Sequence, residues 1–212
     1  MHWTRILENV ARPVDGRVAP VFRANHVAVA LMKIGREQPL GRYELCQNLS
    51  IGEGSVRTML RRLTEEGYLE PEGRQGQRLT ARGRAVFEEM VRDIPFGLYL
   101  DLDGLVIHNI AFANLVRGKA SKVSTGMRQR DEALIHAGHS KAGVTTLVYT
   151  DGRLLMPPGD LDVIVNYQRE SLLILESLKP EDNDAVVIGS SEDRNIAREV
   201  SMAAAMTLFE VN

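Results

Sequence analysis

The feature that most constrains the fold is a change of pattern between residues 22 and 91. Three stretches of helical periodicity, at about residues 22–34, 42–48 and 53–66, precede two short extended runs at residues 68–70 and 78–80. The loop between the two runs is rich in turn-forming residues, which predicts a β-hairpin. A fourth helix, residues 81–91, begins after Thr80. Short helices closed by a hairpin predict a helix-turn-helix with a wing.

The third predicted helix has two distinct faces. At about 100° per residue, Val56, Met59, Leu60 and Leu63 share one face and are expected to pack inward. The rest of the surface offers small, hydroxyl and arginine side chains: Gly54, Ser55, Arg57, Thr58, Arg61 and Arg62. Small residues permit close approach to DNA, while arginines and hydroxyls can reach base edges or phosphates. We therefore predict that residues 53–66 form a recognition helix for the major groove.

Two glutamates weaken this interpretation. Glu53 stands near the helix start, where a carboxylate stabilises the helix dipole but repels a nearby phosphate. Glu65 lies on the outer face with Arg61. A carboxylate can instead accept a hydrogen bond from cytosine N4. The sequence leaves both alternatives open.

The hairpin supplies a second group of cations. Arg74 and Arg78 bracket the tripeptide Gln75-Gly76-Gln77. The glycines permit a tight tip, and the arginines and glutamines can contact phosphates or a minor groove. The alternative is a solvated hairpin with ordinary surface arginines. We predict that the wing, at about residues 71–78, contacts DNA.

Residues 41–83 resemble the winged helix-turn-helix of prokaryotic transcriptional regulators of the MarR/PadR/ArsR kind. In particular they resemble a set of archaeal regulators that share a series of short motifs. In this chain those motifs are Gly41-Arg42-Tyr43-Glu44-Leu45, Gly52-Glu53-Gly54-Ser55-Val56-Arg57-Thr58, Arg62-Leu63, Glu66-Gly67 and Leu79-Thr80-Ala81-Arg82-Gly83.

In such regulators the third helix and the wing contact DNA. The resemblance therefore implies contacts from five residues: Ser55, Arg57, Thr58, Arg61 and Arg74. One departure is Gly52 at the helix start, where Ser or Thr is more usual, although glycine is tolerated there. Some winged helices serve as protein–protein modules instead, so the fold by itself does not decide the function.

Charge divides the chain at about the same place as the pattern. Residues 1–92 hold 15 Lys+Arg and 11 Asp+Glu, a net charge of +4, whereas residues 93–212 hold 11 and 17, a net charge of −6. A basic part suits a phosphate partner. Pro95 cannot continue the preceding helix. We predict an α+β chain with a lead-in arm (residues 1–20), a winged helix-turn-helix domain (21–92) and an α/β domain (95–212).

The second domain alternates extended and helical patterning. Strands are predicted at residues 97–101, 105–116, 144–149, 153–156 and 185–189, and helices at 126–137, 163–178 and 193–209. This order predicts helices packed on a sheet. The resemblance to the archaeal regulators continues here, through residues 126–133 and 142–147, but it implies no chemistry.

One group of residues in this domain is a candidate ligand site. Arg128, Arg130 and Lys141 are cationic, and Thr145 and Thr146 offer hydroxyls at a strand start. Together they could hold a small anionic effector. The alternative is that these are surface charges of a helix and ordinary strand residues.

No cofactor, metal or catalytic centre is predicted. His136 and His139 lie near Asp131 and Glu132, but Gly138 is expected to end the helix between the histidines, and no cysteine joins them. The chain lacks a Walker A loop, a Gly-x-Ser-x-Gly elbow and a Gly-x-Gly-x-x-Gly turn. We therefore expect no enzymatic activity.

These observations favour a sequence-specific regulator of transcription that binds double-stranded DNA. We expect a cytoplasmic protein, because no run approaches the roughly 18 apolar residues of a membrane span and Cys46 is the single cysteine. A homodimer would suit a two-fold operator, and the small residues of the last helix could help to form it. Two alternatives stay open: a small-molecule binding protein or enzyme with an accessory winged helix, and an interaction module of a transcription assembly.

Overall fold

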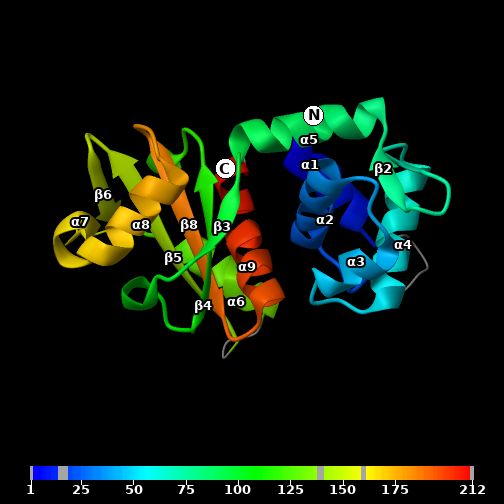
Figure 1. Cartoon of the computed structure of the whole chain (residues 1–212). Coiled ribbons are helices and arrows are strands. Elements are labelled where there is room, and N and C mark those ends of the chain that lie inside the picture. The colour runs from blue at the N-terminus through cyan, green and yellow to red at the C-terminus, as the bar shows by residue number, and fades with distance from the viewer. Residues whose placement is uncertain (1, 14–18, 138–140, 159–160, 211–212) are drawn as a thin grey trace. The chain divides into compact units, whose positions relative to one another are not determined.

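The computed structural model describes residues 2–13, 19–137, 141–158 and 161–210 (Figure 1). Contacts divide the chain into two compact units, Met1–Val91 and Arg92–Asn212. Helices dominate the first unit and a six-stranded sheet the second. The predicted α+β class is confirmed.

The first unit combines helices with a two-stranded hairpin. Helices α3 and α4 contact each other and correspond to the predicted helix-turn-helix. Strands β1 and β2 correspond to the predicted wing. The elements are α1 (Trp3–Ala11), α2 (Ala24–Glu37), α3 (Arg42–Gln47), α4 (Glu53–Glu65), β1 (Leu69–Pro71), β2 (Gln77–Leu79) and α5 (Ala81–Asp93).

The segment expected to be a lead-in arm contains a helix that packs on the rest of the first unit. Helix α1 contacts α2 and α4, and its Trp3, Leu7 and Val10 are buried. Each buried side chain of this kind stabilises the folded state by roughly 1.5–3 kcal/mol compared with leaving it exposed. Residues 3–11 are therefore part of the domain and not a separate arm.

Helix α2 continues through Gly35, where the sequence predicted its end. A Cβ atom at Gly35 would lie 2.3 Å from a ring carbon of Phe87 on α5. The glycine therefore allows α2 and α5 to approach closely and does not cap the helix. The helix ends at Glu37, two residues before Pro39, because the residue before a proline disfavours the helical conformation.

The wing is fastened to the segment between α2 and α3. Within the hairpin, Glu70 lies opposite Arg78. Leu40 and Gln77 exchange backbone hydrogen bonds of 3.0 and 2.9 Å, which adds a bridge to the hairpin. Gly76 has φ of 136°, and a Cβ there would lie 2.3 Å from the carbonyl oxygen of Leu40. Only glycine fits this crossing.

The second unit is built on one antiparallel sheet with strand order β3-β4-β8-β5-β6-β7. Strand β8 lies between β4 and β5 and is buried along its whole length, as expected for a strand covered on both faces. The strands are β3 (Gly97–Leu100), β4 (Ile110–Val116), β5 (Gly143–Thr150), β6 (Arg153–Met156), β7 (Leu161–Asp162) and β8 (Asp184–Ser191).

Helices cover both faces of this sheet. Figure 1 shows α9 (Arg194–Met206) and α8 (Gln168–Leu178) on opposite sides of it. Helix α9 packs on β8, β4 and β5, and α6 (Met127–Ala137) packs against α9 and β5. The other face forms the larger aliphatic core, which includes Leu115, Leu147 and Ile174.

Two predictions for the second unit need correction. The long strand expected at residues 105–116 is shorter, because residues 103–105 form a 3₁₀ turn and β4 begins at Ile110. The helix expected at 163–178 is two helices, α7 (Val163–Asn166) and α8, since the Asn166 side chain donates to the Asp162 carbonyl and competes with helical bonding. The last helix packs within its own unit, on β8, β4 and β5, and its part in a dimer stays a prediction.

Within the described part of the chain, none of the helices combines the length and the apolar character that crossing a membrane requires.

Candidate nucleic-acid interface

Helix α4 has the two faces that its sequence predicts. Val56, Met59, Leu60 and Leu63 are buried against the first unit. On the outer side, Arg57 and Arg61 are exposed, and Ser55 and Thr58 are half-buried. A Cβ atom at Gly54 would meet nothing within 4 Å, so the surface beside it is open and low. A side chain or base edge of a partner can therefore come close to the helix backbone at this point.

Both exposed arginines of α4 are paired along the helix. Arg57 contacts Glu53 at 3.2 Å, and Arg61 contacts Glu65 at 2.8 Å. All four side chains are between 45% and 66% exposed. Solvent-exposed pairs of this spacing are worth only about 0.3–0.5 kcal/mol. Each arginine can therefore leave its glutamate for a phosphate or a guanine edge at little cost.

Arg62 is half-buried and differs from its neighbour Arg61 in its partners. Its guanidinium donates to the backbone carbonyls of Val10 at 2.9 Å and Arg12 at 2.7 Å. It also lies over the Phe22 ring, 5.4 Å from the ring centroid. These contacts fasten the end of α1 to α4. The prediction that Arg62 contacts DNA is therefore replaced by a structural role.

The two wing arginines are also unlike each other. Arg78 contacts Glu70 at 2.9 Å and Glu72 at 3.8 Å across the hairpin. Arg74 is exposed beside Gly73 and forms no ion pair with any residue that the structure describes. The wing therefore presents Arg74 as its available cation.

A hollow of about 410 Å³ runs beside the outer face of α4. Residues 19–22 form one wall, and Gly54, Ser55 and Thr58 contribute to the other. Val21, in that wall, is 72% exposed. The Thr58 hydroxyl donates to the Gly54 carbonyl at 3.0 Å and keeps its lone pairs as acceptors. The face thus combines hydrogen-bonding groups with an apolar edge.

The structure adds two residues that the sequence interpretation missed. On α3, Tyr43 is 67% exposed, and the Arg42 guanidinium lies 4.9 Å from its ring centroid. Arg42 donates to the Tyr43 hydroxyl at 3.2 Å and contacts Glu53 at 3.3 Å. The hydrogen bond to Tyr43 raises the pKa of Arg42 above its ordinary value. In the sequence, the available signal was an arginine directly beside a tyrosine at the start of a short helix.

The thiol of Cys46 on α3 lies near the same polar group and interacts electrostatically with Glu53 and Arg42. Desolvation raises the pKa of Cys46 on α3 above its ordinary value. The neutral thiol is therefore favoured over the thiolate at neutral pH. A neutral thiol is a poor nucleophile, so no reactive role is assigned to Cys46, which is half-buried.

The candidate effector residues of the second unit are not brought to one place. Arg128 and Arg130 are exposed on α6, where Arg128 pairs with Glu210. Thr145 donates its hydroxyl to the Leu105 carbonyl at 2.6 Å. Thr146 is buried, and as the next residue of β5 it points to the opposite face of the sheet. The two threonines therefore cannot face one ligand together.

Lys141 is exposed and lies just before β5, and its carbonyl accepts from the Ser191 hydroxyl at 2.6 Å. That contact involves the backbone and leaves the ammonium group outward. The anionic-effector site predicted from Arg128, Arg130, Lys141, Thr145 and Thr146 is not assembled.

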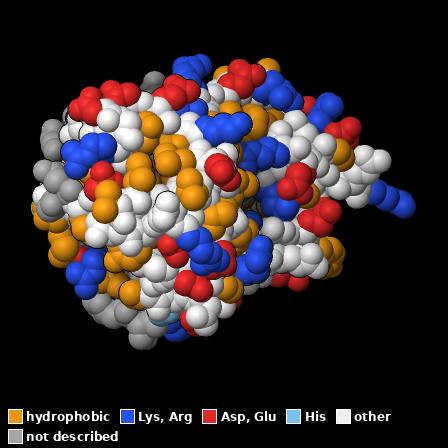
Figure 2. Space-filling view, turned by 60° about the vertical axis from the view of Figure 1, so that its left-hand side comes forward, with side chains coloured by type: hydrophobic (Ala, Val, Ile, Leu, Met, Phe, Trp, Pro, Cys, Tyr) orange, Lys and Arg blue, Asp and Glu red, His pale blue; other side chains and the backbone are white. Residues whose placement is uncertain are grey.

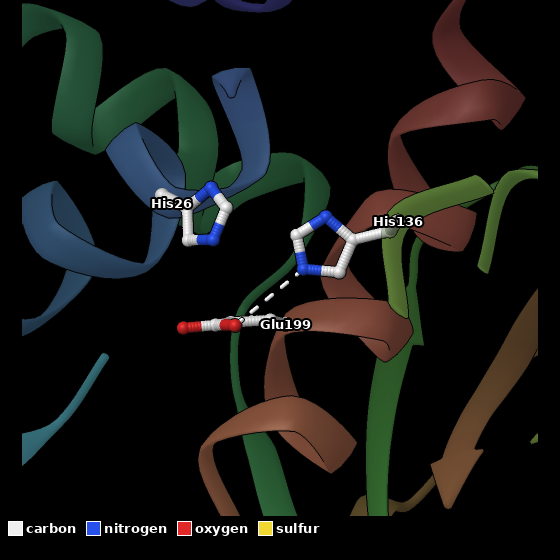
Figure 3. Close-up of side chains that lie close together, drawn as sticks. All are labelled: His26, His136 and Glu199. Carbon is white, nitrogen blue, oxygen red and sulfur yellow. Dashed lines mark hydrogen bonds and ion pairs between the residues drawn. The ribbon is translucent and has the colours of Figure 1, made fainter. Parts of the chain in front are cut away.

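Of the two histidines considered in the sequence, His136 and His139, the structure describes only His136. His136 on α6 lies 3.4 Å from the Glu199 carboxylate on α9 (Figure 3). This contact joins two helices that pack on one face of the sheet. His139 and Gly138 lie outside the described residues. Of the nearby acids, Asp131 is exposed and Glu132 is half-buried on α6.

Comparisons with known proteins cover both units. Residues 107–208 match a family model described as a domain of unknown function, DUF4443, and residues 27–85 match one described as PH0730-like, N-terminal domain. Among solved structures, the chain is similar to the hypothetical protein PH0730 from Pyrococcus horikoshii OT3. The two share 23% sequence identity with a TM-score of 0.71, over 88% of this chain and 92% of that one. A likeness at this identity shows a common fold. Comparison with curated proteins gives no match.

Proposed function

We propose that the chain is a sequence-specific regulator of transcription that binds double-stranded DNA through α4 and the β1–β2 wing. One observation carries the proposal: the outer face of α4 is open at Gly54 and bears hydroxyls and two weakly held arginines. A helix of this kind suits the major groove, where arginine recognises guanine and hydroxyls bind bases or phosphates.

In this proposal different residues of the interface contact bases, phosphates and the minor groove. Arg57, Thr58 and Ser55 face base edges, while Arg61 and Arg42 are close enough to the ends of the helix-turn-helix to meet phosphates. Arg74 at the wing tip enters the adjacent minor groove or contacts its backbone. The hydroxyl of exposed Tyr43 can donate to a phosphate oxygen. The second unit would then supply dimerisation, and no catalytic role is assigned to it.

The test is selection of bound duplexes from fragmented genomic DNA with the full chain, followed by anisotropy titrations on the selected sites. Arg57→Ala and Arg74→Ala should each weaken binding by about tenfold, since one good base or phosphate contact is worth about 1–3 kcal/mol. Arg84→Ala removes an exposed arginine of α5 and is the matched control. Absence of any selected duplex at low salt would refute the proposal.

A second function has one observation in its favour. Three of the arginines on or beside the interface are paired with Glu53, Glu65 or Glu70, so the surface carries both signs of charge. Mixed charge suits a protein partner better than a continuous phosphate chain. A module that binds protein would give salt-insensitive or undetectable DNA binding, and the same titrations distinguish the two.

A further inference from the structure

Helix α8 presents an exposed stripe with an apolar centre. Leu172 is 51% exposed, and the exposed side chains of Arg169 and Glu176 lie about one turn before and after it. Residues three and four apart share one face of a helix. Together with Asp101, Gln168 and Leu173, these residues line a shallow groove of about 590 Å³.

The apolar surface extends beyond α8. Leu98 on the edge strand β3 is 40% exposed and pairs with Ala113, a member of the larger core. Directly opposite residues of two antiparallel strands point to the same face of the sheet, so Leu98 lies on the face that α8 covers. Val165 on α7 is 78% exposed. Figure 2 shows hydrophobic side chains gathered among charged ones on the side of the second unit that carries α7 and α8.

We propose that this face binds a second copy of the chain, with the two α8 helices antiparallel about a two-fold axis beside Leu172. In such an interface the same patch occurs on both sides. A residue one turn before the axis then meets a residue one turn after it. Arg169 therefore lies beside Glu176 of the partner subunit, and the contact is made twice, while the leucines pack at the centre.

The distribution of charge favours this occupant. The stripe has a cation at one end and an anion at the other, so the antiparallel arrangement brings opposite charges together at both ends. Arg169 contacts Asp101 and Glu170 within its own chain, but a guanidinium has five N–H donors. Glu176 forms no ion pair with any residue in the described ranges. The second copy supplies its partner.

The first experiment measures the mass of the full chain in solution by sedimentation equilibrium, without DNA. The wild-type chain should be a dimer, and Leu172→Glu should weaken dimerisation by about tenfold or more, because it puts charge into the apolar centre. Ile135→Glu is the matched control, since Ile135 is 62% exposed on α6. Circular dichroism verifies that both variants fold. A monomeric wild type, or a Leu172→Glu variant that dimerises as well as the control, would overturn the proposal.

The second experiment tests the orientation of the two helices. Glu176→Arg and Arg169→Glu should each weaken the dimer, and the double variant should recover at least part of the loss, because the charges are exchanged and still complementary. In a Cys46→Ser background, Leu172→Cys should form an intermolecular disulfide under mild oxidation, whereas Ile135→Cys should not. No crosslink from Leu172→Cys would place the interface elsewhere. These measurements need no DNA, so they stand apart from the outcome of the duplex selection.

Discussion

Helices α4 and α9 are both 13 residues long, but they differ in how much of their surface is covered. Helix α4 buries one aliphatic stripe and leaves its other sides outward. Helix α9 is buried almost all round, with the run Ser201-Met202-Ala203-Ala204-Ala205-Met206 among its buried residues. A helix can be covered on most sides only where small side chains let its neighbours approach. Helix α4 therefore keeps a side open to solvent, as the proposed DNA contact requires, whereas α9 packs in the core of its own unit.

The largest effect on stability is expected at Gly189 of β8, where α9 packs closely on the strand. A Cβ atom there would lie 2.3 Å from the Ala197 carbonyl oxygen and 2.6 Å from the Ser201 amide nitrogen. We expect Gly189→Ala to lower the free energy of unfolding by about 3 kcal/mol, because the helix must move away from the strand. Urea unfolding followed by circular dichroism measures the change. Wild-type stability in this variant would mean that α9 does not lie so close to β8.

The next effect separates two adjacent arginines of α4. Arg62→Ala should lower the free energy of unfolding by about 1–2 kcal/mol, since charged donors to two backbone carbonyls are lost. Arg61→Ala should change it by less than about 0.5 kcal/mol, because its pair with Glu65 is exposed.

In duplex titrations we expect the opposite ranking of the two variants: Arg61→Ala should lose more affinity for DNA than Arg62→Ala. Hydrogen exchange should show faster exchange of the α1 amides in Arg62→Ala only. Equal stability of the two variants would contradict the structural role of Arg62.

This pair of arginines also shows how far the sequence could predict the site. Helical periodicity places Val56 and Leu63 inward and Arg57 outward, because those positions depend on local geometry. The role of Arg62 depends on Val10 and Arg12, about 50 residues earlier in the chain. No local pattern contains that contact, so an arginine at the edge of the stripe was assigned to DNA.

The same distinction holds for the fold. The strand at residues 153–156 and the helix at residues 53–66 were predicted within a residue or so, since turn formers and periodicity mark their ends. The prediction that Gly35 ends a helix was wrong. The glycine leaves space for the Phe87 ring on a helix some 50 residues later, and no local pattern shows that contact. The break before α8 depends on a side-chain hydrogen bond from Asn166. Contacts between residues that are far apart in the chain could not be predicted from the sequence.

A smaller effect on stability is expected at Gly54 of α4. Gly54→Ala meets no neighbour within 4 Å, and alanine favours a helix over glycine by about 0.5–1 kcal/mol. We expect the variant to be more stable by that amount and yet to bind duplex DNA less tightly, because the methyl group occupies the open surface. Thermal unfolding and anisotropy measure the two changes. Gly189→Ala is the contrasting control, and unchanged affinity of Gly54→Ala would remove Gly54 from the interface.

The smallest expected effect concerns the carboxylate that holds Arg61. Glu65→Gln removes an exposed ion pair worth about 0.5 kcal/mol. Binding to unselected duplex DNA should therefore tighten by about twofold, since Arg61 no longer has to leave its partner. Stability should stay within about 0.5 kcal/mol of wild type. Titrations with a random duplex measure the change, and Glu88→Gln on α5 is the control. Weaker binding by Glu65→Gln would instead indicate that this carboxylate accepts from a base.

The strand order of the second unit has a consequence for synthesis of the protein. Strand β8 is the last strand in the sequence, yet it pairs with both β4 and β5 in the middle of the sheet. On the ribosome, β3 to β7 emerge before β8, so the edges of β4 and β5 that pair with β8 stay unpaired until it is made. The first unit has no such dependence and can fold while the second is still being made. A nascent chain stopped before residue 184 should therefore hold a protease-resistant first unit and an open, chaperone-binding remainder.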